Sequence, residues 1–394
     1  MSFNVENFLH SGCIISNAET GDFWLGIGPS KLSTHPRHEG LNLYAPDFFL
    51  KNSTPWQNYE TYVQLTAAQL LKDLPDPSRF NSGSDGLQQP FIHWSSLDLT
   101  SFQVQFEELK HRLDRGELKK AVPVVSQMGQ GMWRSAQGVD PLTLARLLVS
   151  LIQASQGFPL SVYGVWNEHE GILGASPEIL FDQMSGDELR TYAVAGTRPR
   201  SPLQASTSLL EDPKEQHEHR LVIEGIQQSF RLWEKETGST GGLIRVGKTT
   251  EWVFPHLIHL VTPITFTPGL QPEGRSGFSP GVASLHQFEQ WVRCLHPTPA
   301  LGAFPKERGW AWLEQMEQVT PRFRHGAPFG ILLHSGVSRC LVAIRNLQWK
   351  QNSVRIIAGC GVVPESRFEK EAQELRSKIE SVKNLFHLPR GEQG

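Results

Sequence analysis

An acidic segment near the middle of the chain has residue types and spacing that suit metal chemistry. Residues 212–226 read DPKEQHEHRLVIEGI. On a helix, Glu215 and Glu218 share one face because they are three positions apart. Val222 and Ile226 continue that face toward the interior. The segment therefore predicts two carboxylates at the end of a helix face that is otherwise buried.

A second segment, far along the chain, repeats this pattern. Residues 369–378 read EKEAQELRSK, in which Glu371 and Glu374 are three apart and Lys378 follows one turn later on the same side. Two helices that each present a carboxylate pair suit a hard divalent cation such as Mg²⁺, which keeps water or substrate oxygens at its remaining positions. The alternative is two solvated helix faces with surface charge.

The HEH sequence of the first segment also raises zinc as a metal. His217 and His219 are two positions apart, so on a helix their side chains diverge and do not meet at one ion. The residues therefore favour Mg²⁺ held by carboxylates.

One motif points to a different class of protein. Residues 242–249, GLIRVGKT, satisfy the pattern of a phosphate-binding P-loop, GxxxxGK[ST]. The loop interior is bulky, the preceding residues do not form an apolar strand, and the following TEWVFPHLIHLV is typical of a strand where a P-loop needs a helix. We interpret the match as accidental, and a nucleotide-binding protein stays an alternative.

Composition and charge exclude several function classes. With 394 residues, 39% hydrophobic and 20% charged, the chain is long enough and apolar enough for a large globular core. A net charge of −3 without basic blocks argues against a nucleic-acid partner. We found neither a signal peptide nor an apolar run of about 18 residues, so we expect a cytoplasmic protein without membrane segments. The four scattered cysteines lack metal or disulfide spacing and are expected to be reduced.

Two inserts and many short strands define the expected organisation. Residues 76–90 and 270–281 are rich in turn-forming residues and are expected to lack regular structure. Residues 98–116 carry apolar residues at helical spacing, with Asp98 or Thr100 as the expected cap and Gly116 as the stop. Short β-branched runs bounded by turn residues predict strands, written here as AVPVVS, SVYGVW, GILGAS, LRTYAVAG, FGILL, CLVAIRNLQW and SVRIIAGCGVV.

These elements predict an α+β fold. The strands do not alternate strictly with helices, which favours large, mainly antiparallel sheets over a parallel α/β sheet. We expect two such sheets packed together with helices on the outside.

The chain also resembles the chorismate-utilising enzymes, which comprise the large subunits of anthranilate synthase and aminodeoxychorismate synthase, the isochorismate synthases and the salicylate synthases. The resemblance implies the anthranilate synthase component I-like fold, with residues 1–95 as a strand-rich region of that fold and 96–390 as the catalytic domain. Seven blocks in family order carry it, namely GASPEILF, AVAGTRPR, DPKEQHEHRLV, HLVTPI, HPTPALGAFPK, AIR and AGCGVVPESRFEKEAQELRSK.

The resemblance implies how the two acidic segments bind the metal. Glu218 and Glu374 would bind Mg²⁺ directly, and Glu215 and Glu371 would hold its waters. The ion would grip the ring carboxylate of chorismate, a dianion that four glutamates would otherwise repel.

The remaining substrate contacts are implied in the same way. Lys378 and the backbone of Gly196 and Thr197 would hold the ring carboxylate. Arg345 would bind the enolpyruvyl carboxylate through its planar fork, assisted by the backbone of Gly359 and Gly361. His259 matches a histidine that lies against the ring, and a core histidine with satisfied hydrogen bonds is the alternative. Surface or strand-end charges are the alternative for Lys378 and Arg345.

Three positions bear on what attacks the ring. Lys120 stands where the water-adding members have lysine and the amine-adding members have glutamine, and a desolvated lysine can act as a general base. Ala195 stands where aminodeoxychorismate synthases have their nucleophilic lysine. Ala300 stands where amine-adding members have threonine. All three favour water over ammonia, so no glutaminase partner is expected.

The general acid implied by the resemblance is Glu178 in SPEIL. It would protonate the departing C4 hydroxyl while Lys120 activates water at C2, which requires opposite shifts of the two pKa values. A turn carboxylate is the alternative for Glu178, and a snorkelling strand-end lysine is the alternative for Lys120.

The predicted product is isochorismate, because LIHLVTPI and the chain length are more similar to isochorismate synthases. Salicylate synthase, an amine-adding large subunit and a catalytically silent chorismate-binding protein remain alternatives, as do menaquinone, siderophore or salicylate pathways downstream. Two departures concern substrate handling. His325 replaces a family aromatic residue that contacts the enolpyruvyl carboxylate, and the histidine could still donate a hydrogen bond to this group. SRFEKE lacks the Asp-Pro expected before the second carboxylate pair.

Overall fold

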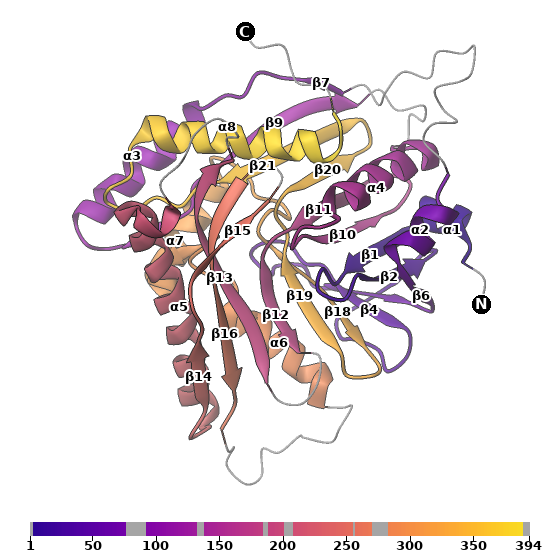
Figure 1. Ribbon diagram of the computed structural model, residues 1–394, viewed down its shortest axis with the longest axis horizontal. Helices are drawn as coiled ribbons and strands as arrows, with labels where there is room; N and C mark the ends of the chain where they lie inside the picture. Colours follow the sequence, from indigo (N-terminus) through magenta and orange to yellow (C-terminus); the bar gives the residue numbers. More distant parts are fainter. Residues whose placement is uncertain are drawn as a thin grey trace.

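Two large antiparallel sheets form the centre of the molecule (Figure 1). The computed structural model describes residues 3–75, 92–131, 138–183, 188–200, 208–254, 257–269 and 283–388. The predicted inserts at 76–90 and 270–281 lie outside the described residues.

The first sheet joins strands from both ends of the chain. Within the described residues its order is β6 (Thr61–Thr66), β2 (Asp22–Ile27), β1 (Gly12–Ser16), β10 (Ser161–Trp166), β11 (Glu170–Ser176), β20 (Asn346–Lys350), β21 (Ser353–Gly359), β9 (Val124–Gly131) and β7 (Ile92–Trp94).

The second sheet contains longer central strands. Its order in the described ranges is β14 (Leu243–Val246), β16 (Leu257–Thr267), β13 (Leu189–Pro199), β12 (Ile179–Gln183), β19 (Ser338–Val342), β18 (Pro328–Leu333), β4 (Leu41–Tyr44), β5 (Trp56–Tyr59) and β3 (Lys31–Ser33), with β15 (Thr250–Val253) also paired to β16. A short separate ladder pairs β8 (Lys120–Ala121) with β17 (Ala303–Phe304).

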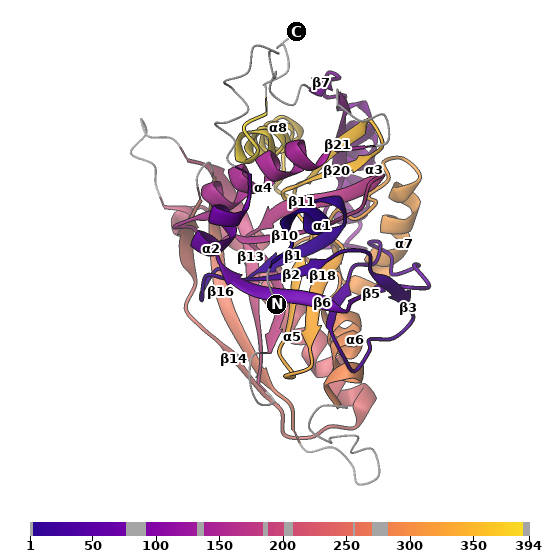
Figure 2. The same cartoon turned by 90° about the vertical axis from the view of Figure 1, so that its right-hand side faces the viewer.

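Helices cover the outer faces of both sheets. They are α1 (Val5–His10), α2 (Ala67–Asp73), α3 (Thr100–Asp114), α4 (Pro141–Ser155), the 3-10 helix η2 (Leu209–Glu211), α5 (Pro213–Thr237), α6 (Ala283–Leu295), α7 (Lys306–Glu317) and α8 (Phe368–Leu385). Helix α5 lies along β13 and β16, and α8 lies across β21 (Figure 1). Helices α1 and α4 lie together beside β1 and β10 (Figure 2).

The alternation of side chains along each strand explains these layers. In β1, Cys13 and Ile15 belong to the apolar cluster between the sheets, together with Leu43 and Leu341 of the second sheet. Ile14, which points the other way, packs in the cluster that the helices cover. The expected α+β fold, with two packed antiparallel sheets and helices outside, is confirmed.

The first part of the chain contributes strands to both sheets. Strand β1 pairs with β10 of the first sheet, and β4 pairs with β18 of the second. Residues 1–95 thus share their sheets with later residues, while the division of the chain at residue 95 stays a prediction.

One predicted strand is wrong in an informative way. CLVAIRNLQW forms two strands, β19 in the second sheet and β20 in the first, and the chain crosses between the sheets at residues 343–345. Arg345 has a left-handed φ of 55° at this crossing, which ends the extended backbone. TEWVFPHLIHLV likewise forms β15 and β16 rather than one strand.

Other local predictions have mixed outcomes. The helix expected in 98–116 is α3, and Gly116 follows it with a φ of 68°. Leu99 occupies the N-cap position, while the Asp98 carboxylate accepts a hydrogen bond from the Thr100 N–H at 2.8 Å.

The P-loop-like GLIRVGKT contains β14, whose backbone is paired to β16, which contradicts a phosphate-binding loop. The four cysteines are free thiols.

Candidate active site

A pocket between the two sheets gathers residues from most of the quoted sequence blocks. Its lining comes from the β11–β12 connection, β13, β16, α5, the segment after α6, the crossing at Arg345, β21 and α8. The predicted site residues that line it are Glu178, Thr197, Glu218, His259, Ala300, His325, Arg345, Gly359, Gly361 and Lys378. Lys120, Gly196, Glu215, Glu371 and Glu374 lie next to these lining residues, as the contacts below show.

Capping of α5 sets the position of the first carboxylate pair. The Asp212 side chain accepts hydrogen bonds from the N–H groups of Lys214 and Glu215, and Pro213 occupies the first turn. Helix α5 therefore starts just before the two glutamates, and its apolar face packs on β13. Glu215 and Glu218 are buried on that face, as predicted.

The two acidic helices meet at a lysine that our sequence analysis did not single out. Lys214 Nζ lies 3.0 Å from Glu215 Oε1, 3.4 Å from Glu218 Oε2 and 3.2 Å from Glu371 Oε1. Three of the four predicted metal-binding carboxylates, from α5 and α8, thus surround one ammonium group. Glu374 instead pairs with Lys378 at 2.6 Å.

Charge explains why this cluster is stable. Burial alone would lower the pKa of Lys214, but the carboxylates of Glu218, Glu371 and Glu215 raise it above its usual value. Burial and the nearby Glu374 raise the pKa of Glu371 to about 7. Among the described residues, the four carboxylates are paired with three lysines, Lys214, Lys120 and Lys378, so a further cation would stabilise their charged forms.

The donor set fits Mg²⁺. Carboxylate oxygens are its preferred protein ligands, and the buried Oε2 of Glu371 has no hydrogen-bond partner among the described residues. In the part of the chain that the structure describes, no three acidic, His or Cys side chains converge as a ready metal cage. The carboxylates are turned toward lysines instead. Lys214 is partly exposed, so its flexible side chain has a path out of the cluster.

Lys120 is fully buried beside the first carboxylate pair. It lies in β8, opposite Phe304 of β17. Its Nζ is 2.9 Å from Glu218 Oε1, so the two side chains form an ion pair, but the angles at this contact are not those of a hydrogen bond. Gly361 permits this packing, because a Cβ there would collide with Glu218 Oε1 and come within 2.7 Å of Lys120 Cε. The buried position contradicts the alternative of a snorkelling lysine at a strand end.

Glu178 is a buried carboxyl group at the start of β12. Thr298 Oγ1 donates a hydrogen bond to its Oε1 at 3.2 Å. Burial raises the pKa of Glu178 to about 7, although Thr298 and the positive charge of Lys120 oppose that shift. Glu178 can therefore carry a proton near neutral pH, as a general acid must. Thr298 was missed, and its place in the quoted block HPTPAL is the signal that could have found it.

A hydrogen-bonded chain connects β13, β16 and the crossing. Arg345 Nη2 lies 3.2 Å from His259 Nε2, and Thr197 Oγ1 lies 3.0 Å from His259 Nδ1. Because a guanidinium only donates, His259 Nε2 accepts and its proton sits on Nδ1. Burial and the Arg345 charge hold the pKa of His259 well below its usual range, which agrees with a neutral ring.

Backbone geometry on β13 links this chain to the carboxylates. Gly196 has a φ of 78° at a bulge in β13, and the next N–H, that of Thr197, donates to Glu215 Oε2 at 2.9 Å. On the opposite wall, Lys378 Nζ donates to the Gly359 carbonyl at 2.8 Å. Both predicted backbone segments therefore adjoin the charged groups.

His325 is the least satisfied group of the pocket. It is buried, and neither ring nitrogen has a hydrogen-bond partner among the described residues. Burial, with the nearby Arg322, Lys378 and Arg345 charges, holds the pKa of His325 well below its usual range. A neutral imidazole with one free N–H and one free acceptor thus faces the pocket.

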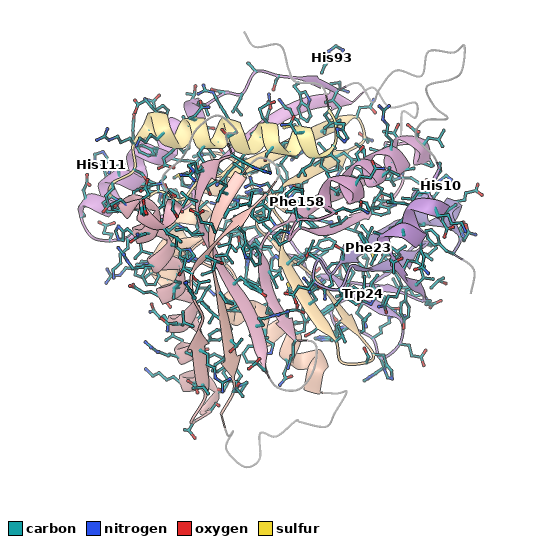
Figure 3. All side chains as sticks on the ribbon, in the orientation of Figure 1. His10, Phe23, Trp24, His93, His111 and Phe158 are labelled. Carbon is teal, nitrogen blue, oxygen red and sulfur yellow. The ribbon has the colours of Figure 1, made fainter. Side chains whose placement is uncertain are left out.

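The other histidines discussed above lie elsewhere. His217 pairs with Glu365 and His219 with Thr262, which agrees with their predicted divergence. The labelled His10, His93 and His111 lie on outer elements of the molecule (Figure 3). In the described part of the chain, no helix is long and apolar enough to cross a bilayer.

Comparison with known proteins shows similarity along nearly the whole chain. Residues 46–387 match the family model described as "Chorismate binding enzyme". Isochorismate synthase EntC of Escherichia coli K12 is 28% identical over 257 residues, which is 64% of this chain and 59% of the relative. The vibriobactin-specific isochorismate synthase of Vibrio cholerae is 27% identical over 84% of this chain and 72% of its own.

Solved structures share the fold. The chain matches the crystal structure of DhbC from Bacillus anthracis with a TM-score of 0.73 and 20% identity over 98% of this chain and 99% of that one. Anthranilate synthase component I of Streptococcus pneumoniae matches with a TM-score of 0.63 and 18% identity over 89% and 82% of the two chains.

Proposed function

Because the chain belongs to the family of chorismate-binding enzymes, we propose that it converts chorismate to isochorismate. One observation carries the proposal. The buried Lys120 and the carboxyl group of Glu178, whose pKa is about 7, lie around one pocket together with two further cations, Arg345 and Lys378. The two isochorismate synthases from Escherichia coli and Vibrio cholerae support the same reaction.

The pocket has the charges that a dianionic substrate needs. Arg345 and Lys378 both line it, and a guanidinium and an ammonium can each bind one carboxylate. Glu218, Glu374, Glu215 and Glu371 would hold Mg²⁺. When bound, the ion supplies positive charge that offsets these carboxylates and binds a substrate carboxylate. His259 holds the Arg345 guanidinium in place.

The proposed reaction exchanges one hydroxyl position for another. In its uncharged form, after the proton of its ion pair has been released to solvent, Lys120 removes a proton from water as the water oxygen bonds to C2 of the ring. The two ring double bonds shift, the C4–O bond breaks, and Glu178 gives its proton to the departing oxygen, so one water enters and one leaves. Proton exchange with solvent then restores a neutral lysine and a protonated Glu178.

Two small residues favour water as the nucleophile. Ala195 and Ala300 both line the pocket, so neither position supplies an amine or a hydroxyl to the ring. An enzyme of this kind works without ammonia and without a glutaminase partner.

The test is product identification. The protein is incubated with chorismate and Mg²⁺, with and without ammonium, and the product is separated by chromatography. We expect isochorismate at a rate that ammonium does not change. Anthranilate or aminodeoxychorismate would refute the role of Lys120, and salicylate as the first released product would refute isochorismate release.

A further inference from the structure

A second, larger cavity opens at the end of the two sheets that is nearest the start of β1. We call it the outer cavity, and the residues used here are Tyr59, Phe323, Arg324, Gln348, Trp349 and Arg355. Its volume is about 740 Å³, against about 60 Å³ for the catalytic pocket. Among the described residues, the two share no lining residue, so the outer cavity is a separate space with room for a small organic molecule.

Arg324 brings a positive charge into this cavity, whose lining also includes the cation of Lys350 and the carboxylates of Asp47 and Glu170. Its guanidinium is partly buried and makes no ion pair or side-chain hydrogen bond with a described residue. The acidic side chains whose charges influence Arg324 are those of Glu170 and Asp47, and neither is close enough to form an ion pair with it. Glu170 instead approaches Lys350 to 3.8 Å, and Asp47 accepts a hydrogen bond from the Lys51 N–H. Arg324 is therefore available to an anion.

A second guanidinium lies over an aromatic ring of the cavity. Arg355 Cζ is 3.7 Å from the centre of the Phe323 ring, a cation–π contact, and the Arg355 side chain makes no ion pair with a described residue. Phe323 is 45% exposed and has a left-handed φ of 51°, an uncommon conformation for an aromatic residue. This backbone turns the ring outward as a platform for Arg355. Two guanidinium forks in one cavity suit carboxylate recognition.

The cavity wall is aromatic as well as charged. Trp349 lies over Gly171, where any Cβ would collide with the indole ring. Its indole N–H is buried and has no hydrogen-bond partner among the described residues. Tyr59 and Trp349 are buried behind this wall, and Phe323 offers the exposed aromatic surface next to the two guanidinium groups. A flat ring that carries a carboxylate matches both features.

We propose that the outer cavity is a second ligand site, which binds a planar organic carboxylate through Arg324 and Arg355. The site is connected to the catalytic pocket by sequence and by hydrogen bonds. Arg324 directly precedes His325 of the pocket, and its N–H bonds to Gln348 Oε1 at 3.5 Å. Gln348 in turn donates to Asn346, the neighbour of Arg345.

Calorimetric titration with benzoate and, separately, with inorganic phosphate tests the proposal. Benzoate binds the wild-type protein, and Arg324→Gln weakens that binding about tenfold, the loss expected for a charged hydrogen bond. Lys350→Gln, a change of a more exposed cation in the same cavity, leaves the affinity within about twofold. Phosphate binds more weakly than benzoate, because it lacks the flat ring.

The outcomes that overturn the proposal are distinct. If benzoate binds wild type and Arg324→Gln with equal affinity, its carboxylate does not bind at Arg324. If phosphate binds more tightly than benzoate, the site does not select a planar organic carboxylate. If Arg324→Gln does not fold, Arg355→Gln at the half-buried rim gives the same comparison. Turnover of chorismate by Arg324→Gln, with KM within about twofold of wild type, shows an intact catalytic pocket whatever the product is.

Discussion

Lys120 Nζ lies 2.9 Å from Glu218 Oε1, so the proposed general base and a proposed metal ligand form one buried ion pair. The two residues come from β8 and α5, which are far apart in the sequence. Neither charge has much access to solvent. A change to the proposed base Lys120 therefore affects the proposed metal ligand Glu218 and the position of α5, and a change to Glu218 affects Lys120.

A double-mutant cycle measures this coupling. Removing one partner of a buried ion pair leaves the other charge unpaired, so Lys120→Met or Glu218→Gln alone lowers the free energy of unfolding by about 3 kcal/mol. The double variant loses about 1–3 kcal/mol less than the sum, because neither charge remains unpaired. Urea unfolding of the four proteins supplies the values.

The same variants separate stability from chemistry. Lys120→Met lowers kcat by about 10²–10⁴, the usual contribution of a general base. If the double variant loses as much unfolding free energy as the two single variants together, the ion pair does not form in solution. If Lys120→Met turns chorismate over at a near-normal rate, Lys120 is not the general base.

Lys214 predicts how the site responds to metal. Its ammonium bonds to three of the four carboxylates that would hold Mg²⁺, so ion and lysine compete for the same oxygens. Lys214→Met therefore tightens Mg²⁺ binding about tenfold, since one charged contact no longer has to be displaced. Without added metal the variant unfolds at a lower temperature than wild type, because the carboxylates lose their counter-ion.

Calorimetric titration with Mg²⁺ and thermal unfolding with and without EDTA measure both effects. Lys235→Met, an exposed position on the same helix, is the matched control and changes neither. Unchanged or weaker Mg²⁺ binding by Lys214→Met would contradict the competition.

Glu178 gives the reaction a defined pH dependence. Its pKa is raised by burial to about 7, against an ordinary 4.5. The proton it must donate is lost as pH rises, so kcat falls through an apparent pKa near 7, and Glu178→Gln abolishes both turnover and this dependence. A pH profile of kcat between pH 5 and about 9 tests the assignment.

The same shift affects stability. Between the two pKa values the folded state holds a proton that the unfolded state has released, so the Glu178 contribution falls as pH rises from 4.5 through 7. Glu178→Gln is therefore more stable than wild type by about 3 kcal/mol at pH 8 and equal to it near pH 4. A pH-independent difference in urea unfolding would contradict the raised pKa.

The sequence predicted the elements around the candidate site better than the contacts that connect them. Glu215, Glu218, Glu371 and Glu374 follow from helical spacing, and α5 and α8 place them as expected. Lys214 was missed although its i,i+4 spacing to Glu218 on the same helix is a signal for that pair. Its contact with Glu371 of α8 could not be found from spacing along one helix. The family resemblance supplied Lys120 and Glu178, since nothing local distinguishes them.

The crossing at Arg345 shows a second limit. CLVAIRNLQW is mostly apolar and contains no glycine or proline that would mark a break, so local pattern predicts one strand, whereas its two halves lie in different sheets. The left-handed Arg345 that joins them has no sequence signal comparable to a glycine. The kink is fixed by tertiary packing, and the same kink places the guanidinium beside His259.

His325 combines an expected stability gain with a loss of function. Its two buried ring nitrogens lack partners among the described residues, and an unsatisfied polar group costs about 1–3 kcal/mol. His325→Phe, which has a similar shape and the family's aromatic character, therefore stabilises the fold by about 1 kcal/mol. We also expect it to raise the KM for chorismate about tenfold, because phenylalanine cannot donate the hydrogen bond to a substrate carboxylate that the family resemblance implies for this position. Urea unfolding and steady-state kinetics at pH 7.5 measure the two effects, with the exposed His111→Phe as control. A destabilised variant with unchanged KM would mean that the imidazole is a structural group rather than a substrate contact.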